Sequence, residues 1–236
     1  MSFLNQSIRL TGGVEHLYAI TDLLKKISAY DYSYVHIISG EDFPTRPIDE
    51  IESFFDNQSS IFIQCQPCDV NETKRSAWYK FYWPYAGLKQ NYKNPLIRYI
   101  NLFTVGLQKV FPIFQKRKLG EFEKIYTGLI WGSLPKDAVE YILNYIECKN
   151  FMEELKWCKI PEEFFFQTIL ANSEFKNRIV DDNKRYGNFG DGDGSGPTYL
   201  KMVDVTRADS QGAFFARKIG KNTDVIKFLK ERQTFE

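Results

Sequence analysis

Pro161-Glu162-Glu163-Phe164-Phe165-Phe166-Gln167-Thr168-Ile169-Leu170 joins two carboxylates to a strongly apolar run. The pattern predicts a helix that begins at Pro161, because proline lacks the N–H that would have no intrahelical partner in the first turn. Acidic side chains are favoured in the same turn, since its unpaired N–H groups carry partial positive charge. The aromatic residues that follow predict a buried face that excludes water. The stretch is therefore expected to be a core helix with two carboxylates at its start.

The Glu162–Glu163 pair has more than one interpretation. A dry and oriented carboxylate can act as a general base and remove a proton from a hydroxyl. The ordinary alternative is an acidic helix start above a core-facing aromatic face, and these ten residues alone do not decide between the two. A glycosidase pair is disfavoured, because neighbours on a helix point about 100° apart whereas that chemistry needs carboxylates that face each other.

Helices and strands are predicted to alternate on both sides of this stretch. Apolar residues at spacings of three and four, together with proline and glycine at the ends, predict helices over 14–29, 48–55, 95–110, 135–146 and 222–232. Short apolar runs predict strands over 32–38, 61–65, 125–134, 178–180 and 213–216. The aromatic and basic segment 71–93 has no clean period and is expected to be a long functional loop or an irregular excursion. The alternation predicts an α/β layered sheet, and without a repeat or linker it predicts one domain over residues 1–236.

The composition excludes several classes of protein. Of 236 residues, 43% are hydrophobic and 26% are charged, which is typical of a globular protein with a real core. The net charge of +1 gives no global drive toward nucleic acid or an anionic membrane, so any positive site must be local. The chain has no transmembrane run and no signal peptide at its start, so we expect it in the cytoplasm or at the periphery of a membrane.

The cysteines and histidines are few and scattered. Cys65 and Cys68 have the C-x-x-C spacing, but zinc would need four converging ligands, and the two histidines lie elsewhere in the sequence. We therefore expect reduced, partly buried thiols rather than a metal or redox site.

Four blocks of the chain carry a family resemblance. They are YDYSYVHIISGEDFP at 30–44, YTGLIW and VEYIL within 126–143, PEEFFFQTIL with NS within 161–173, and FFARKI at 214–219. In this order they resemble the core-2/I-branching β-1,6-N-acetylglucosaminyltransferase family, which also contains the peptide O-xylosyltransferases. The resemblance implies a GT-A-like layered α/β/α fold with a mixed central sheet.

The resemblance also implies a reaction and the residues that carry it. Family members transfer a sugar, of the GlcNAc or xylose type, from a UDP-sugar to a glycan hydroxyl, with inversion and without a metal ion. Glu163 matches the general base, with Glu162 as the second candidate. Lys218 and Arg217 match the basic site that faces the leaving diphosphate, and Arg185 resembles a further arginine of the donor site. Polysaccharide or surface-glycan assembly, in a family associated with membranes, is the expected setting.

The acceptor site is expected from residues at other positions of the family pattern. Lys74, Arg75 and Trp78 fall where the family places acceptor-contacting groups. Asp42 could bind a sugar hydroxyl or simply cap a turn before Phe43-Pro44, and Trp131 could line the site or pack in the core.

Metal and cofactor are both expected to be absent, with the UDP-sugar as co-substrate. Fixed cations can stabilise a leaving diphosphate as a metal ion does. The only Asp-x-Asp motif, Asp191-Gly192-Asp193, lies in a late glycine-rich run rather than after an early strand.

One departure from the family pattern keeps a second function open. Family members begin with a further strand–helix–strand that carries much of the uridine pocket, whereas this chain starts at Arg9-Leu10-Thr11-Gly12-Gly13 in that pattern, which predicts an N-terminally truncated fold. The chain is therefore either an active transferase or a non-catalytic glycan-binding or partner module derived from one. Affinity for UDP distinguishes the two.

Overall fold

The computed structural model describes residues 13–68, 75–84, 94–111, 119–189, 197–220 and 223–233. Its α-helices are α1 (Val14–Ile27), α2 (Ile48–Asp56), α3 (Arg75–Lys80), α4 (Pro95–Val110), α5 (Lys136–Cys148), α6 (Phe151–Leu155), α7 (Phe165–Ala171), α8 (Met202–Ser210) and α9 (Thr223–Gln233). Its strands are β1 (Tyr34–Ile37), β2 (Asp42–Pro44), β3 (Ile61–Ile63), β4 (Gln66–Pro67), β5 (Tyr126–Thr127), β6 (Gly132–Pro135), β7 (Ile179–Val180), β8 (Arg185–Gly187) and β9 (Phe215–Arg217). Two 3-10 turns, η2 (Pro161–Glu163) and η3 (Glu174–Arg178), flank α7.

The strands form three small sheets. The four-stranded sheet has the order β1-β6-β3-β7, with β6 antiparallel to both neighbours and β7 parallel to β3. The three-stranded sheet has the order β2-β9-β8, antiparallel on one side of β9 and parallel on the other. Strands β4 and β5 form a two-stranded pair. The predicted α/β architecture with a mixed sheet is confirmed.

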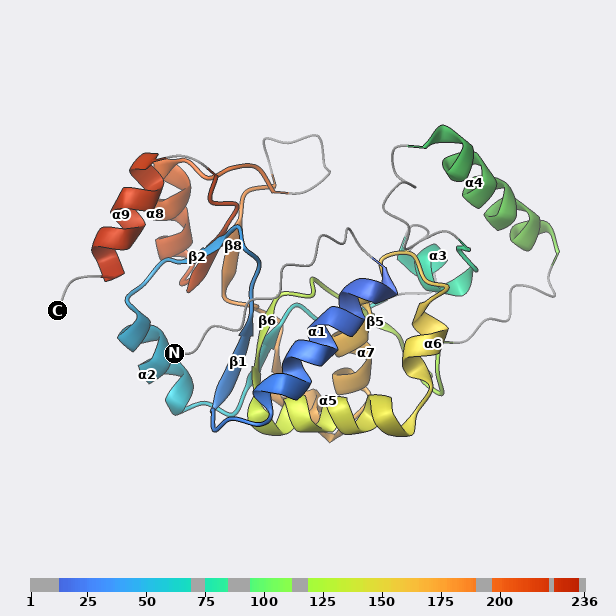
Figure 1. Cartoon of the computed structure of the whole chain (residues 1–236), viewed down its shortest axis with the longest axis horizontal. Helices are drawn as coiled ribbons and strands as arrows, with labels where there is room; N and C mark the ends of the chain where they lie inside the picture. The colour runs from blue at the N-terminus through green and yellow to red at the C-terminus, as the bar shows by residue number, and fades with distance from the viewer. Residues whose placement is uncertain are drawn as a thin grey trace.

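The four-stranded sheet separates two layers, because side chains alternate between the faces of a strand. Val35 and Ile37 of β1 join the main core, which includes side chains of α1, α5 and α7. Tyr34 of the same strand packs on the opposite side, against a cluster formed by α2 and the start of β9. Figure 1 shows α8 and α9 outside the three-stranded sheet, at the end of the molecule opposite α4.

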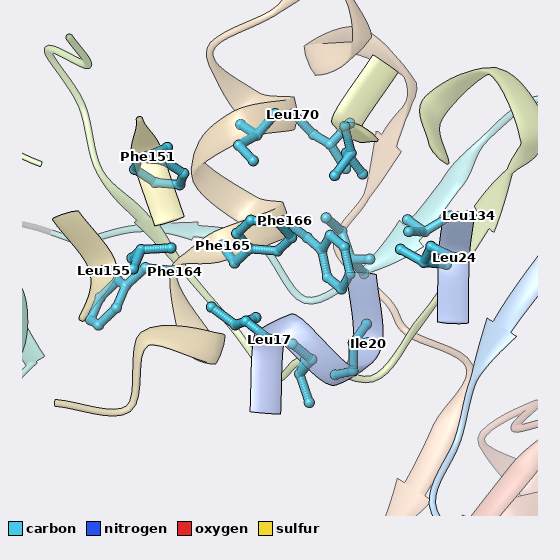
Figure 2. Close-up of a cluster of buried hydrophobic side chains, with 14 of the residues drawn as sticks. Leu17, Ile20, Leu24, Leu134, Phe151, Leu155, Phe164, Phe165, Phe166 and Leu170 are labelled. Atoms are coloured by element: carbon cyan, nitrogen blue, oxygen red, sulfur yellow. The ribbon is translucent and has the colours of Figure 1, made fainter. Parts of the chain in front are cut away.

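The three consecutive phenylalanines form the centre of the main core. Phe164, Phe165 and Phe166 are fully buried. Phe164 meets Tyr79 of α3 at 5.6 Å between ring centroids, and Phe165 stacks on Phe151 of α6 at 6.3 Å. Figure 2 shows the three rings spreading from one turn of chain toward different neighbours. The expectation that this stretch is buried is therefore confirmed.

The start of the helix differs from the prediction. Helix α7 begins at Phe165, while Pro161, Glu162 and Glu163 form the separate turn η2. Ile160 precedes this turn in the left-handed conformation, with φ 52°. The chain therefore changes direction before α7, and the two carboxylates stand ahead of the helix rather than in its first turn.

Two further expectations need correction. The predicted strand over 125–134 is interrupted and becomes β5 and β6, in different sheets. The segment 71–93 is not wholly a loop, because its described part contains α3, where Ser76 and Tyr79 are buried. Burial of Tyr79 against Phe164 is a tertiary contact, which local periodicity cannot reveal.

Candidate active site

Glu163 has a buried carboxylate oxygen that lacks a partner. Its main chain is fixed on both sides: its N–H donates to Ile160 O at 3.2 Å, and its C=O accepts from Gly128 N–H at 3.0 Å. Its side-chain Oε2 is buried and has no hydrogen-bond partner among the described residues. Burial raises the pKa of Glu163, the nearby charge of Arg75 opposes this rise, and the charge of Glu162 adds to it. A carboxylate in this state is a good proton acceptor.

Glu162 has a different environment, although it is the adjacent residue. Its Oε2 accepts a hydrogen bond from Gly13 N–H at 3.3 Å, and its Oε1 lies 3.8 Å from His16 Nδ1. Gly13 is the N-cap of α1 and has φ 98°, a conformation that side chains rarely adopt. Glu162 thus binds the N-terminus of α1, where a negative charge is favoured. Of the two carboxylates, Glu163 is therefore the one with a buried oxygen that accepts no hydrogen bond from the described residues.

The cations expected near the diphosphate lie at the end of β9. Arg217 pairs with Asp42 across the β2–β9 register, with 3.3 Å between Nε and Oδ1, although these two atoms make no hydrogen bond. The Arg217 guanidinium also lies over the Trp131 ring, 4.3 Å from its centroid. The next residue, Lys218, is partly exposed and has its Nζ 3.9 Å from Glu41 Oε2.

Arg185 is held tightly within the protein. It donates from Nη2 to Gly132 O at 2.7 Å and from Nη1 to Ser133 Oγ at 3.3 Å, and it also bonds Asn183 O. Burial lowers the pKa of Arg185 to about 9, and the charge of Asp42 opposes this shift. Because its guanidinium is occupied by these acceptors, Arg185 primarily joins β8 to β6.

The short segment from Gly128 to Trp131 contacts both the Glu163 main chain and the Arg217 guanidinium. Gly128 holds the Glu163 main chain, and three residues later Trp131 lies under Arg217. Three residues of chain reach at most about 11 Å. A side chain at 128 would place its Cβ 1.9 Å from Gln64 O, so glycine is needed there for close approach. The backbone carbonyl of Glu163 and the guanidinium of Arg217 therefore contact the two ends of one short segment.

The candidates for acceptor binding have different neighbours: Arg75 lies near Glu163, whereas Asp42 pairs with Arg217. Asp42 caps its turn, accepting from Ser39 N–H at 2.6 Å, and its side chain is almost fully buried. Arg75 is exposed and close enough to Glu163 to lower its pKa. Trp131 is partly buried against the main core. Lys74 lies outside the described residues, as do Asp191, Gly192 and Asp193.

Lys159 contacts Trp78, one of the acceptor-binding candidates, although its place in the sequence gives no sign of this. Its Nζ lies 5.5 Å from the centroid of the Trp78 ring and 5.1 Å from that of Trp83. Its backbone N–H donates to Trp78 O at 2.9 Å, and burial lowers its pKa. These tryptophans are more than seventy residues away in the chain, so no local pattern could have indicated the contact.

The described residues contain no group of three His, Cys, Asp or Glu side chains that could hold a metal ion. None of the four cysteines, all of which lie in the described ranges, forms a disulfide, and burial raises the pKa of Cys65 to about 12. A thiol with such a pKa stays protonated and is a poor nucleophile or ligand.

Comparison with known proteins gives consistent matches. The family model described as Core-2/I-Branching enzyme matches residues 11–211. The chain is 26% identical over 136 residues to the beta-glucuronosyltransferase GlcAT14A of Arabidopsis thaliana, covering 56% of this chain and 30% of the relative. It is 21% identical over 216 residues to the xylosyltransferase sqv-6 of Caenorhabditis briggsae, covering 83% of this chain and 24% of the relative. The chain thus spans less than a third of the length of these two curated relatives.

Proposed function

Because the chain belongs to the Core-2/I-branching enzyme family, we propose that it is a glycosyltransferase that moves a sugar from a UDP-sugar to a hydroxyl of a glycan acceptor. Its α/β layers and mixed sheet are those of a GT-A-like fold. The single observation that carries the mechanism is the buried, unpartnered Oε2 of Glu163.

The proposed reaction is a single displacement with inversion. The acceptor hydroxyl gives its proton to the Glu163 carboxylate, and its oxygen forms a bond to C1 of the donor sugar. The bond between C1 and the diphosphate oxygen breaks, and its electron pair leaves with UDP. The raised pKa of Glu163 supports this role, since a base whose pKa lies closer to neutrality is a better match for the proton it removes.

Negative charge that develops on the departing UDP needs stabilisation. Lys218 and Arg217 are proposed to supply it as fixed cations, in place of a divalent ion. Lys218 is the better candidate for direct contact, because its side chain is more exposed than that of Arg217 and its Nζ lies as far as 3.9 Å from Glu41 Oε2. In this mechanism the transfer rate is unchanged when EDTA removes divalent ions, and an EDTA-sensitive rate would contradict it.

The donor sugar is proposed only as a class. The relatives are named for glucuronosyl and xylosyl transfer, and the family resemblance adds N-acetylglucosamine. A screen should therefore compare UDP-glucuronic acid, UDP-xylose and UDP-N-acetylglucosamine, first for donor hydrolysis and then for transfer to glycan acceptors.

Substitution of the two glutamates tests the proposed base. Glu163→Gln keeps the shape of the side chain but removes the proton acceptor, so we expect kcat to fall about 10²–10⁴-fold. Glu162→Gln is the matched control: its amide oxygen can still accept from Gly13 N–H, so we expect a much smaller loss. Both variants should bind UDP as the unmodified protein does. Equal kcat in Glu163→Gln and the unmodified protein would remove Glu163 from the mechanism.

The second candidate function, a non-catalytic glycan-binding module, is favoured by one observation. Arg185 and Arg217 are already occupied by protein groups, which leaves fewer free cations for a diphosphate. This function predicts glycan binding without UDP affinity. Calorimetric titration with UDP decides: measurable binding that Lys218→Ala weakens supports the transferase, and no binding supports the module.

A further inference from the structure

Helix α4 contacts the rest of the protein through one narrow stripe. Of its residues, Val105 and Gln108 are buried. Gln108 exchanges two hydrogen bonds with the Tyr82 backbone, accepting from Tyr82 N–H at 2.8 Å and donating to Tyr82 O at 2.9 Å. Figure 1 shows α4 at the edge of the molecule, beyond α3 and away from the sheets.

The outward face of α4 is apolar. Leu96, Tyr99, Phe103 and Val110 are exposed by 65%, 69%, 69% and 72%. At 100° per residue these four positions fall within an arc of about 60° on the helix. A helix of a globular protein normally turns such a face inward. Here the buried stripe contains the polar Gln108 beside Val105, and four aromatic and aliphatic side chains face outward.

The stretch of sequence that contains α4 carries charge of a single sign. The helix carries Arg98 and Lys109 and no acidic residue, and both cations are exposed on one side of it, about 80–100° from the edge of the apolar face. In the sequence, the 48 residues from 73 to 120 hold ten Lys and Arg and neither Asp nor Glu. Because the whole chain has a net charge of +1, the other residues sum to −9. The net charge of the whole chain therefore gives no sign of this basic stretch.

We propose that α4 docks the protein on a bilayer that carries anionic lipid headgroups, with Leu96, Tyr99, Phe103 and Val110 entering the interface. An apolar helix face flanked by Lys and Arg is the pattern of helices that lie in a membrane surface. Basic residues near an anionic leaflet are attracted to its negative surface potential.

Two observations favour a membrane surface over other partners for the apolar face of α4. A second copy of the chain would bring two basic regions together, and like charges oppose that pairing. A 16-residue helix is about 24 Å long, and none of the described helices has the length and apolar character to cross a bilayer. Helix α4 therefore suits a position along the surface.

Vesicle co-sedimentation tests the proposal. The full chain should bind vesicles of phosphatidylglycerol and phosphatidylcholine at least tenfold more strongly than vesicles of phosphatidylcholine alone, and high salt should weaken binding. The double variant Tyr99→Glu with Phe103→Glu should lower binding to the anionic vesicles at least tenfold. The control double variant Tyr30→Glu with Val203→Glu alters two residues that are 59% and 52% exposed elsewhere, with the same change of charge. It should bind more tightly than the α4 variant.

Several outcomes would overturn the inference. They are no preference for anionic vesicles, equal binding by both double variants, or a dimer in sedimentation velocity that the α4 variant dissolves without any vesicle binding. Circular dichroism melting confirms that each variant is folded. Transfer to a water-soluble acceptor should be unchanged in the α4 variant, so failure of this inference is distinguishable from failure of the proposed reaction.

Discussion

Glu162 and Glu163 carry the same side chain, yet their carboxylates have different partners. Glu162 holds the N-terminus of α1 through Gly13 N–H, while Glu163 has an oxygen buried without a partner. A buried acceptor without a hydrogen bond costs free energy, of order 1–3 kcal/mol. An unpaired oxygen of this kind can accept a hydrogen bond from a ligand, and we propose that the ligand group here is the acceptor hydroxyl.

The pH dependence of transfer should report this group. The base works only when ionised, so kcat/KM should fall as the pH drops through the Glu163 pKa, which burial raises above the ordinary value. Arg75 lowers this pKa. Arg75→Gln should therefore move the acidic limb of the profile to higher pH, and the change should be small because Arg75 is exposed and its charge is screened. Arg75→Lys keeps the charge and should leave the limb nearly in place. An acidic limb identical in all three proteins would contradict the assignment.

At the scale of elements, the position of Glu163 depends on how η2 meets the segment between β5 and β6. Gly128 N–H binds the Glu163 carbonyl, and its missing side chain lets this segment approach Gln64 O. The turn is thus positioned by a close backbone contact as well as by the aromatic core beneath it.

Gly128→Ala should disturb this contact. Its Cβ would lie 1.9 Å from Gln64 O, and relief of such overpacking costs about 1–3 kcal/mol of unfolding free energy. We expect a lower urea midpoint and a lower kcat, because the Glu163 turn must move. Gly106→Ala is the control: it lies in α4 with nothing within 4 Å, and it should raise stability by about 0.5–1 kcal/mol through helix propensity. A Gly128→Ala protein as stable as the unmodified one would show that the segment relaxes freely.

At the scale of the whole molecule, Arg185 joins the three-stranded sheet to the four-stranded sheet. It reaches from β8 to Gly132 O and Ser133 Oγ of β6. His36 of β1 meets the same hydroxyl at 2.8 Å, and burial together with the Arg185 charge lowers the pKa of His36 to about 3. The protein therefore keeps one positive charge at this junction across the neutral range.

Arg185→Met should loosen the junction between the two sheets. It leaves several acceptors without a donor, and we expect a loss of about 2–4 kcal/mol in urea unfolding. Lys176→Met makes the same change of charge at an exposed position and should stay within about 0.5 kcal/mol. Equal midpoints for the two variants would show that Arg185 does not hold the sheets together.

The local spacing of apolar residues was sufficient to predict where several helices begin and end. Helices α2 and α4 begin and end within one residue of the prediction, and α1 and α5 within two. Their apolar spacing is a property of the helix itself, so it can be read without knowledge of neighbours. The short helices α3, α6 and α8 were not predicted, because a few residues carry too little periodicity and their conformation depends on packing.

The alternation of helices and strands, the burial of the phenylalanines and the family resemblance could all be predicted from the order of residues, and the family match confirms the last of these. Which glutamate is anchored depends on the folded arrangement, since Gly13 and Glu162 meet across 149 residues of chain. The folded arrangement likewise decided that the apolar face of α4 points outward, because spacing predicts a helix but not what lies against each side. Periodicity is encoded in neighbouring residues, whereas a partner is fixed only when distant segments pack together.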